Sequence, residues 1–526
     1  MNVPHGQQGS LANSALWNDL RRFYETKGPA AWNVDGVPNH VTINPGFATR
    51  YAHVALRYAQ DCRRLGHATG RRPFPVVELG AGIGGFGYRL AGALDRLRAA
   101  LGLDGLPLSQ VMSDLAAANV GSWRVQPDLA PLITQGRVVA EAFDVLSGDT
   151  VGAVGREPVD PPVFMANYLF DSLPMDVFRV TRGQLFVGLV EAGGLPAAEA
   201  EPQSDQGLGI AWSYQPVELP YYGDPALDAT LADCIGQVAD DYWVLFPVGA
   251  MRSLKRLSDL AGGPMLLIAA DLGTSEEPAF FEREPELSGP GRYFYAPVDF
   301  ALLGRYAARL GGEARHHVRD RVLNVSLFSF GIPFDRLHET SVAADTFFDM
   351  VPHTLIAGTM SHMQSAGVPP PLPLFLDLAS AGSFDPSLID AMAGPLAEEF
   401  RAGTHPPALW AQLRAALDRF AGNVFVNGGP KAGGVDSLYV MACLLQQMQE
   451  YSMALDFFQR SIERFGETAE HLYNMALCAY LAGDQDTALD RLHRVMDLDP
   501  YHVLARGWIA QIGFEQAKAV PEPALA

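Results

Sequence analysis

The stretch Pro75-Val-Val-Glu-Leu-Gly-Ala-Gly-Ile-Gly-Gly-Phe-Gly87 decides the fold of this chain. An apolar run ends in an acid, Glu78, and is followed by closely spaced glycines and a helix-like segment from Tyr88 to Ala100. A buried strand, a tight glycine turn and a helix N-terminus in this order form the nucleotide-binding corner of a doubly wound α/β sheet. The sequence therefore predicts a Rossmann-like α/β sheet with a nucleotide at this turn.

The glycines alone fit two kinds of cofactor. Gly80, Gly82 and Gly85 satisfy the dinucleotide pattern G-x-G-x-x-G, whereas Gly80, Gly82 and Gly84 satisfy the methyltransferase pattern E/D-x-G-x-G-x-G. Both ligands need a close approach to the backbone that a Cβ atom would block. A dinucleotide places its doubly negative pyrophosphate at the helix N-terminus, where the charge of Glu78 is unfavourable. S-adenosylmethionine (SAM) carries a sulfonium cation and an ammonium group, which an acid complements.

Two further acids favour SAM. The next strand-like run, from Leu108, ends in Asp114, which lies 29 positions after Gly85. A third strand-like run, starting at Arg137, ends in Asp144, an acid suited to an adenine amino group. Each acid alone is a common solvated residue at a strand end. Three acids at successive strand ends after a glycine turn predict a SAM site formed by Glu78, the glycines, Asp114 and Asp144.

Composition restricts the function classes. The chain has 526 residues, 48% of them hydrophobic, which is enough for two to four domains with large cores. The formal net charge is -21, which disfavours nucleic acid and anionic lipid as partners. The four cysteines show no zinc-like spacing, and we expect no metal site. No signal sequence and no apolar run of 18 residues stand out, so the sequence predicts a cytoplasmic protein without a membrane span.

Four regions follow along the chain. We expect an N-terminal helical segment at 1–65 and a SAM-dependent methyltransferase domain at 66–335, in which strands and helices alternate. An insertion at about 185–260 contains the polar, acidic segment 193–206 and would cover the open edge of the sheet. A helical connector is expected at 336–428. A glycine-rich linker at 427–434 then leads to the C-terminal region.

The C-terminal region contains a repeat. Ala454-Leu-Asp-Phe-Phe-Gln-Arg460 and Ala488-Leu-Asp-Arg-Leu-His-Arg494 are 34 residues apart. This period is typical of tetratricopeptide (TPR) helix pairs, in which small residues lie where the helices cross. The sequence predicts all-α TPR-like repeats at 435–518. Stacked pairs of this kind bind peptides or partner proteins, pack on another domain or form a homodimer.

The fourth strand-like run leads into a second motif. Met165-Ala-Asn-Tyr-Leu-Phe-Asp-Ser-Leu-Pro174 places Asn167 and Asp171 after that strand, where the transferable methyl group is expected. Asn167 can form hydrogen bonds there, and Asp171 can orient or deprotonate a nucleophile. In the alternative interpretation, Asn167 caps a short helix and Asp171 lies in its first turn. Both roles are compatible, because a residue at this helix start still faces the cleft.

At this point the chain resembles the MidA-like class I methyltransferases. The resemblance is carried by the glycine motif, the stretch from Ala166 to Pro174, the strand end Asp271-Leu-Gly273 and Pro297-Val-Asp-Phe300, and it covers about 44–330. The family includes a mitochondrial assembly factor that methylates an arginine of a partner protein. The resemblance implies SAM bound near Glu78, Gly80, Gly82, Gly84, Asp114 and Asp144. It also implies a substrate pocket near Asn167 and Asp171.

This chain departs from the family at two positions. Tyr168 stands where the family usually has glutamate, and Pro297 stands where it usually has histidine. Arginine methylation benefits from carboxylates that hold the guanidinium group, so the missing glutamate bears on the substrate. We expect methylation of a protein or peptide that is recruited in part by the repeats, with arginine among the candidate acceptor residues. The alternatives are a small-molecule methyltransferase with structural repeats, and a non-catalytic assembly factor that binds SAM.

Overall fold

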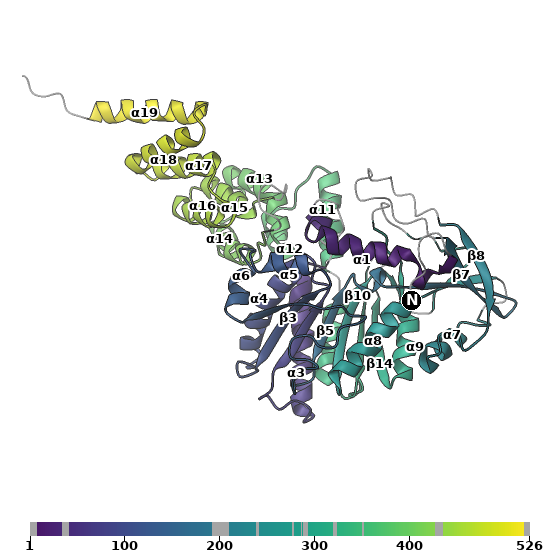
Figure 1. Ribbon diagram of the computed structural model, residues 1–526. Coiled ribbons are helices and arrows are strands. Elements are labelled where there is room, and N and C mark those ends of the chain that lie inside the picture. The colour runs from purple at the N-terminus through teal and green to yellow at the C-terminus, as the bar shows by residue number, and fades with distance from the viewer. Residues whose placement is uncertain are drawn as a thin grey trace, which may run out of the picture. The chain divides into compact units, whose positions relative to one another are not determined.

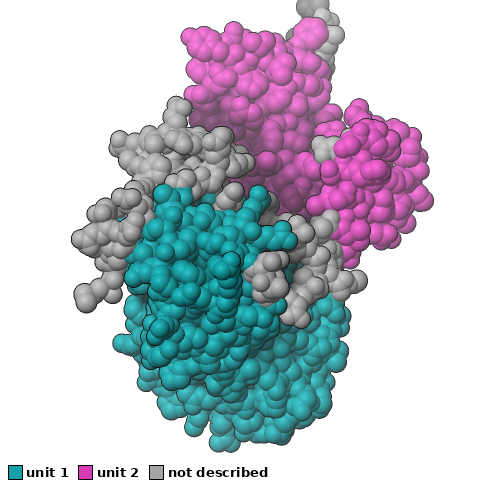
Figure 2. All heavy atoms as spheres, turned by 90° about the vertical axis from the view of Figure 1, so that its right-hand side faces the viewer, with its two compact units in different colours: residues 1–351 teal, residues 352–526 magenta. Residues whose placement is uncertain are grey.

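The computed structural model describes residues 8–33, 42–191, 210–237, 241–275, 278–285, 287, 293–318, 323–349, 352–426 and 435–519. The predicted acidic segment 193–206 and the predicted linker 427–434 lie outside the described residues. The chain divides into two compact units, Met1–Val351 and Pro352–Ala526 (Figure 2). The finer boundaries expected from the sequence remain predictions.

A seven-stranded, mostly parallel sheet forms the centre of the first unit (Figure 1). Its strands are β2 (Phe74–Leu79), β3 (Leu108–Asp114), β4 (Val138–Ala142), β5 (Val163–Asn167), β10 (Met265–Asp271), β14 (Gly312–Val318) and β15 (Asn324–Phe330). Their order is β14-β15-β10-β5-β2-β3-β4, and the five strands from β10 to β4 are parallel. β15 runs antiparallel to both of its neighbours. The carboxyl ends of β2, β3 and β5 therefore meet at one edge of the sheet.

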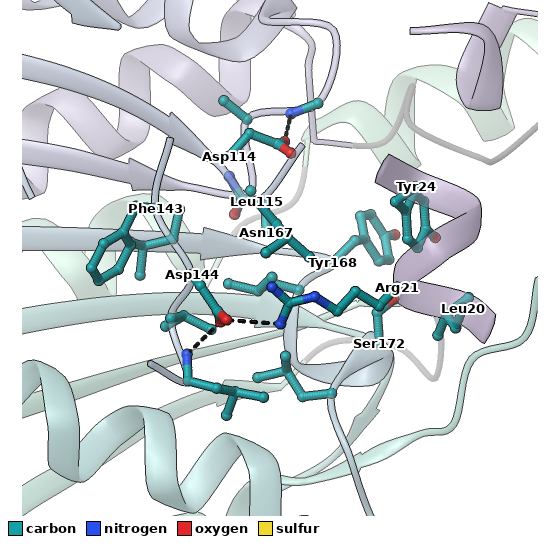
Figure 3. Close-up of a pocket in the computed structure, with 18 of the residues that line it drawn as sticks. Leu20, Arg21, Tyr24, Asp114, Leu115, Phe143, Asp144, Asn167, Tyr168 and Ser172 are labelled. Carbon is teal, nitrogen blue, oxygen red and sulfur yellow. Dashed lines mark hydrogen bonds and ion pairs between the residues drawn. The ribbon is translucent and has the colours of Figure 1, made fainter. Parts of the chain in front are cut away.

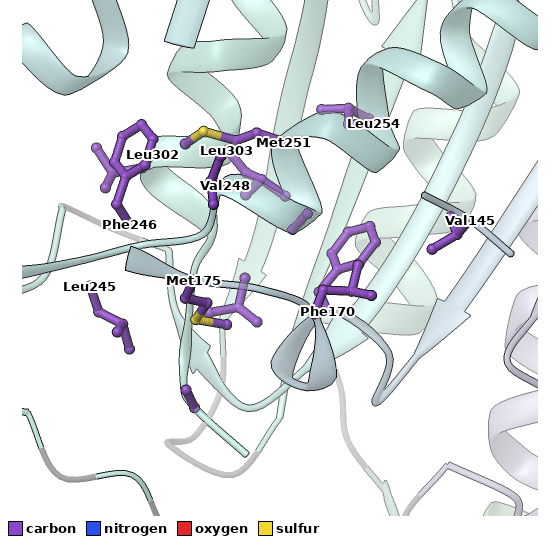
Figure 4. Close-up of a cluster of buried hydrophobic side chains, with 14 of the residues drawn as sticks. Val145, Phe170, Met175, Leu245, Phe246, Val248, Met251, Leu254, Leu302 and Leu303 are labelled. Atoms are coloured by element: carbon purple, nitrogen blue, oxygen red, sulfur yellow. The ribbon is translucent and has the colours of Figure 1, made fainter. Parts of the chain in front are cut away.

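Both faces of this sheet are buried, as expected for parallel strands. In β10, Leu266 and Ile268 pack with helices on one face, whereas Leu267 and Ala269 pack on the other. The first face is covered by α3 (Pro45–Arg64), α4 (Gly85–Ala100) and α10 (His338–Phe348). The second face is covered by α8 (Val248–Ala261) and α9 (Phe300–Arg309), and Figure 4 shows Met251, Leu302 and Leu303 of these two helices in the shared core. The predicted doubly wound arrangement is confirmed.

A second, antiparallel sheet interrupts the alternation that the sequence predicts through residue 330. Its strands are β1 (Gln8–Ser10), β6 (Asp176–Thr181), β7 (Gln184–Glu191), β8 (Trp212–Val217), β9 (Tyr242–Phe246) and β12 (Phe280–Phe281). They follow the order β1-β7-β6-β9-β12, and β8 pairs with β7. Val177 and Val244 of this sheet belong to the same core as α8. The N-terminal residues therefore join a sheet that the sequence did not predict.

The remaining elements of the first unit are short or peripheral. They are α1 (Ala15–Lys27), α2 (Ala30–Asn33), α5 (Ala117–Trp123), α6 (Ala130–Thr134), α7 (Pro225–Ala232), β11 (Gly273–Thr274), β13 (Val298–Asp299) and 3-10 helices at Leu11–Asn13 and Phe170–Ser172. α1 joins the core on the second face of the large sheet through Leu16 and Leu20.

The described secondary-structure elements of the second unit are all helices. Its helices are α11 (Pro352–Ser365), α12 (Leu372–Ala381), α13 (Pro386–Ala402), α14 (Pro407–Ala421), α15 (Ser437–Gln447), α16 (Tyr451–Phe465), α17 (Ala469–Leu481), α18 (Gln485–Leu498) and α19 (Val503–Ala519). α16 and α18 begin 34 residues apart, at the predicted repeat period. Ala454 and Ala488 occupy equivalent, fully buried positions in these helices. The predicted fold class, an α/β doubly wound methyltransferase-type sheet followed by an all-α region, is confirmed.

Among the described residues, no helix combines the length and the apolar character that crossing a membrane requires.

Candidate functional site

The turn between β2 and α4 borders a cavity of about 460 Å³ (Figure 3). Gly82 lies in this turn with φ +54°, a conformation that favours glycine. Its amide donates a 2.8 Å hydrogen bond to Asp114 Oδ2 at the end of β3. A Cβ atom on Gly82 would lie 3.1 Å from the Trp32 ring. The turn is therefore shaped by its glycines and fixed by an acid of the neighbouring strand.

Most of the predicted site residues line this one cavity. They are Glu78, Gly80, Gly82, Asp114, Asp144 and Asn167. Gly84 and Asp171 are outside its described lining. At Gly84, a Cβ atom would lie 2.6 Å from Leu129 and 2.9 Å from Met112, so this glycine allows the helix to pack closely.

Two buried carboxyl groups face the glycine turn. Glu78 is 4% exposed, and burial, together with the nearby charge of Asp114, raises its pKa to about 8. The Glu78 Oε2 atom is buried and has no hydrogen-bond partner within the described residues. Burial also raises the pKa of Asp114, although the amides of Ala116 and Gly82 donate to its carboxyl group. The lining of the cavity thus includes the Glu78 carboxyl group, whose ionised form a cation would stabilise.

Gly87 makes room for Glu78, a role that the sequence analysis missed. Gly87 is the third residue of α4, and a Cβ atom there would lie 2.6 Å from Glu78 Oε2 and 2.6 Å from the Met112 sulfur. A larger residue would displace the carboxyl group from its place beside the first turn of the helix. The third glycine of Gly84-Gly-Phe-Gly87 was the available signal.

We expect a Glu78→Gln variant to change how stability depends on pH. A carboxyl group whose pKa is raised in the folded state, here to about 8 from 4.5, destabilises the fold progressively as the pH rises between those values. At pH 8 the variant should be more stable than the wild type by on the order of 1 to 4 kcal/mol, and at pH 4 the difference should vanish. Urea unfolding at both pH values measures this. Glu157→Gln, at an exposed site, is the control, and identical curves for Glu78→Gln and the wild type would contradict the account.

Asp144 lies at the side of the cavity and is held by the N-terminal helix. Its Oδ2 atom accepts a 2.8 Å hydrogen bond from Arg21 of α1, and its Oδ1 atom accepts from the Leu146 amide (Figure 3). Burial acts to raise the pKa of Asp144, but hydrogen bonds from Ser147 and Arg21 outweigh it, and the pKa is lowered. Asp144 is therefore ionised and already paired, unlike Glu78.

The N-terminal segment supplies a wall of the cavity that sequence reasoning missed. Trp17, Arg21 and Tyr24 of α1 and Trp32 of α2 all line it. The Tyr24 and Trp32 rings stack with centroids 5.7 Å apart. The only signal in the sequence was the amphipathic pattern of this helix, because nothing in a local pattern shows which distant loop a helix covers.

We expect loss of the Arg21–Asp144 pair to speed release of a ligand from this cavity. Arg21→Gln removes the ion pair that holds α1 at the end of β4. An exposed ion pair of this kind contributes about 0.2–1 kcal/mol, which corresponds to a dissociation rate up to about fivefold faster. Stopped-flow dissociation of S-adenosylhomocysteine measures the effect. The matched control is Arg22→Gln, because Arg22 pairs with Asp19 on the same helix. Equal rates in the two variants would rule out the role given to Arg21.

Asn167 and Tyr168 lie where β5 ends. Asn167 Oδ1 accepts a 2.7 Å hydrogen bond from the buried Tyr51 hydroxyl of α3, which leaves the amide nitrogen as a donor facing the cavity. Asn167 does not cap the following 3-10 helix, so that part of the alternative interpretation is wrong, whereas Asp171 lies in the first turn of this helix, as that interpretation predicted. Tyr168 has φ +48°, a strained value for a residue other than glycine. Strain at this position is typical of a functional loop. The hydrogen bond between Tyr51 and Asn167 could not be predicted from the sequence.

Asp171 lies behind Ser172, which is the residue that reaches the cavity. The Ser172 hydroxyl donates a 3.0 Å hydrogen bond to Asp171 Oδ1. On its other side, Asp171 is hydrogen-bonded to Asp271 of β10, whose carboxyl group accepts from the amides of Phe170, Asp171 and Leu272. Burial raises the pKa of Asp171 to about 6 and that of Asp271 well above its ordinary range. The predicted catalytic acid is thus one half of a buried carboxyl pair.

Asp299, in the last of the motifs noted in the sequence, has a structural role. It is the N-cap of α9, and its side chain accepts hydrogen bonds from the amides of Leu302 (2.9 Å) and Ala279 (2.7 Å). Asp299 is therefore a helix cap.

One group of side chains outside the cavity has the residue types of a metal site. His317, Asp345 and Asp349 bring one ligand atom each to within 4.8 Å of one another. His317 Nδ1 is 2.9 Å from Asp349 Oδ1, and Asp345 is paired with Arg315. A cation at this group would compete with the arginine.

Comparison with known proteins finds loose structural likenesses and one repeat. The tetratricopeptide-repeat family matches residues 472–500, which confirms the repeat in α17 and α18. A comparison of the sequence with curated proteins finds no match. A solved COG1565 superfamily protein from Burkholderia thailandensis is 15% identical, with a TM-score of 0.40, over 63% of this chain and 90% of its own.

Two further solved structures contain S-adenosylhomocysteine. One is a COG1565 superfamily member from Burkholderia thailandensis, 17% identical with a TM-score of 0.36, over 55% of this chain and 78% of its own. The other is a DhpI complex, 11% identical with a TM-score of 0.26, over 60% of this chain and 98% of its own. At such values we rest the functional assignment on the cavity itself.

Proposed function

We propose that this chain is a SAM-dependent methyltransferase whose cofactor binds at the Gly80–Gly84 turn. The observation that carries the proposal is the buried carboxyl group of Glu78, which lines the cavity beside this turn and whose Oε2 atom has no hydrogen-bond partner within the described residues. A cationic ligand restores the interactions that this group loses on burial, and it favours the ionised form of Glu78.

The residues around the cavity fit SAM better than a dinucleotide. Glu78 and Asp114 are both buried acids at the glycine turn, and a cationic ligand favours their ionised forms, whereas the two negative charges of a pyrophosphate would oppose their ionisation. The Gly82 turn leaves room that a Cβ atom would fill, so a ligand can approach the backbone closely. Glu78, Gly80, Gly82, Asp114 and Asp144 would hold the cofactor, whose sulfonium group supplies an activated methyl group.

The other end of the cavity would hold the methyl acceptor. Asn167 presents an amide nitrogen there, and Ser172 presents a hydroxyl group. α1 lies over the same region and would exclude water while reactants are aligned. These residues position the acceptor and receive its proton, which is what a direct methyl transfer requires of an enzyme.

We propose a protein or peptide as the acceptor, recruited in part by the TPR-like helices. Support comes from exposed apolar side chains near the end of the repeat, since Tyr501 is 85% exposed and Val503 is 77% exposed. Helix pairs of this type commonly bind extended peptides. An acid at position 168 would hold the guanidinium group of an arginine acceptor. Tyr168 stands there instead, so this position gives no support to an arginine acceptor.

Transfer of radiolabelled methyl groups tests the function. The full chain is added with labelled SAM to a lysate from a strain that lacks the protein, and the labelled species is identified by mass spectrometry. We expect a labelled protein band with the wild type and none with Gly82→Val. Label only in small molecules would favour a small-molecule acceptor with structural repeats. No label, with cofactor binding intact, would favour a non-catalytic assembly factor.

A further inference from the structure

A chain of polar groups leads from the cavity to the buried pair Asp171 and Asp271. Ser172 and Tyr24 both line the cavity (Figure 3). The Tyr24 hydroxyl lies within hydrogen-bond reach of Ser172, and the Ser172 hydroxyl donates to Asp171 Oδ1 at 3.0 Å. Asp171 in turn shares a hydrogen bond with Asp271. Polar groups therefore connect the acceptor end of the cavity with a base that the cavity does not touch directly.

The pair Asp171 and Asp271 can accept one proton. Both carboxyl groups are buried, with 6% and 1% of their residues' surface exposed, and two adjacent negative charges in such a place repel strongly. Within the described residues, neither group is paired with a lysine or arginine. Three backbone amides donate to Asp271 and stabilise one negative charge. The pair therefore holds one proton and one negative charge at neutral pH, and a second proton would make it neutral.

We propose that Ser172 takes the proton of the methyl acceptor and passes its own proton to the Asp171–Asp271 pair. This inference rests on the proposed function and assigns the acceptor to a chemical class, an N–H or O–H group that must lose a proton. Tyr24 acts as a positioning residue, because its hydroxyl lies beside Ser172, whose own hydroxyl donates to Asp171.

The step balances in atoms and charge. A lone pair of the acceptor forms the new bond to the methyl carbon, while the sulfur–methyl bond breaks and its electron pair stays on sulfur. The acceptor proton moves to Ser172 Oγ as the hydroxyl proton of Ser172 moves to Asp171 Oδ1, and the proton that Asp171 already carried passes to the ionised carboxyl group of Asp271. The carboxyl pair changes from one negative charge to none, a change that burial favours. An acceptor that attacks without losing a proton, such as a thiolate, would have no use for this chain of groups.

The titratable groups around the pair come from several elements. Tyr24 of α1 feels the charge of Asp171, and Tyr51 of α3 feels that of Asp271. Burial, with these charges, raises the pKa of both phenols, so they stay neutral. The carboxyl pair is therefore the group in contact with Ser172 whose charge changes near neutral pH, and Glu78, with a pKa of about 8, titrates at the cofactor end of the same cavity.

Infrared spectroscopy tests the pair without any acceptor. With S-adenosylhomocysteine present at neutral pH, the difference between wild type and Asp171→Asn should contain the band of a protonated carboxyl group. In Ser172→Ala the same band should move to higher wavenumber, because Asp171 loses a hydrogen-bond donor. A Ser122→Ala variant is the control, since the Ser122 hydroxyl donates to a backbone carbonyl outside the cavity. Absence of the band, or no movement in Ser172→Ala, would overturn the proposal.

Labelled methyl transfer into the lysate tests the proton route. The wild-type rate should rise with pH through the pKa of Asp171, about 6. Ser172→Ala should lower the rate about 10- to 100-fold and flatten this profile, while its affinity for S-adenosylhomocysteine is unchanged. Ser172→Thr keeps the hydroxyl and should recover most of the rate. A wild-type rate and profile in Ser172→Ala would overturn this inference alone, whereas a wild type without transfer would overturn the proposed function and the inference with it.

Discussion

Gly82→Val should lower the affinity for S-adenosylhomocysteine by about 100-fold or more, a loss of about 2.7 kcal/mol. Gly82 has φ +54°, and a β-branched residue held there is strained by about 1–3 kcal/mol. Its Cβ atom would also lie 3.1 Å from the Trp32 ring, in space that borders the cavity. The strain cannot be relieved freely, because a change of backbone conformation at position 82 would move its amide away from Asp114. Strain and lost space therefore both lower the affinity. Isothermal titration calorimetry with both proteins measures the change.

The control for this variant is Gly136→Val. Gly136 has φ +69°, but no atom lies within 4 Å of a Cβ atom placed there. It therefore carries similar backbone strain in open space and should leave the affinity unchanged. Equal affinities of wild type and Gly82→Val would remove the glycine turn from the binding site.

Asp271→Ala should destabilise the first unit by about 3 kcal/mol or more. The variant leaves the amides of Phe170, Asp171 and Leu272 without their acceptor, and each unsatisfied buried group costs about 1–3 kcal/mol. Relief of the repulsion between the two carboxyl groups offsets part of this loss. The loss of the three hydrogen bonds outweighs the relief of repulsion, because three buried amides lose their acceptor and only one charge is removed. The midpoint of urea unfolding measures the effect.

Asp95→Ala is the matched control for that stability change. Asp95 is partly exposed and pairs with Arg137 at the surface, where an ion pair contributes only about 0–1 kcal/mol. Its unfolding midpoint should stay close to that of the wild type. If Asp271→Ala unfolded at the same midpoint as Asp95→Ala, the loop after β5 would not depend on Asp271.

The large sheet and the cofactor end of the cavity could be predicted because their signals are local. A buried run followed by glycines predicts a strand, a turn and a helix. The stretch Pro75–Gly87 indeed contains most of β2, the turn and the first residues of α4. Parallel strands end at one edge, so Glu78, Asp114 and Asp144 were expected together and line one cavity. The repeat could be predicted for the same reason, because its 34-residue period can be counted in the sequence.

The rest of the site depends on contacts between residues far apart in the chain. Arg21 meets Asp144 across 123 positions, and Tyr51 meets Asn167 across 116, so neither pair leaves a local pattern. Asp171 was expected at the cavity because it follows β5. It turns toward Asp271 instead, because the backbone amides of the loop fix the acid of the neighbouring strand. Strands β6 to β9 pair antiparallel, a topology that apolar runs alone do not reveal.

Titration of the wild-type chain with two ligands tests the central claim most directly. Calorimetry is carried out with S-adenosylhomocysteine and, separately, with NAD under the same conditions. The account predicts one site per chain for S-adenosylhomocysteine and no binding of NAD, because Glu78 and Asp114 face the glycine turn. Binding of NAD without binding of S-adenosylhomocysteine would contradict it and make the turn a dinucleotide site.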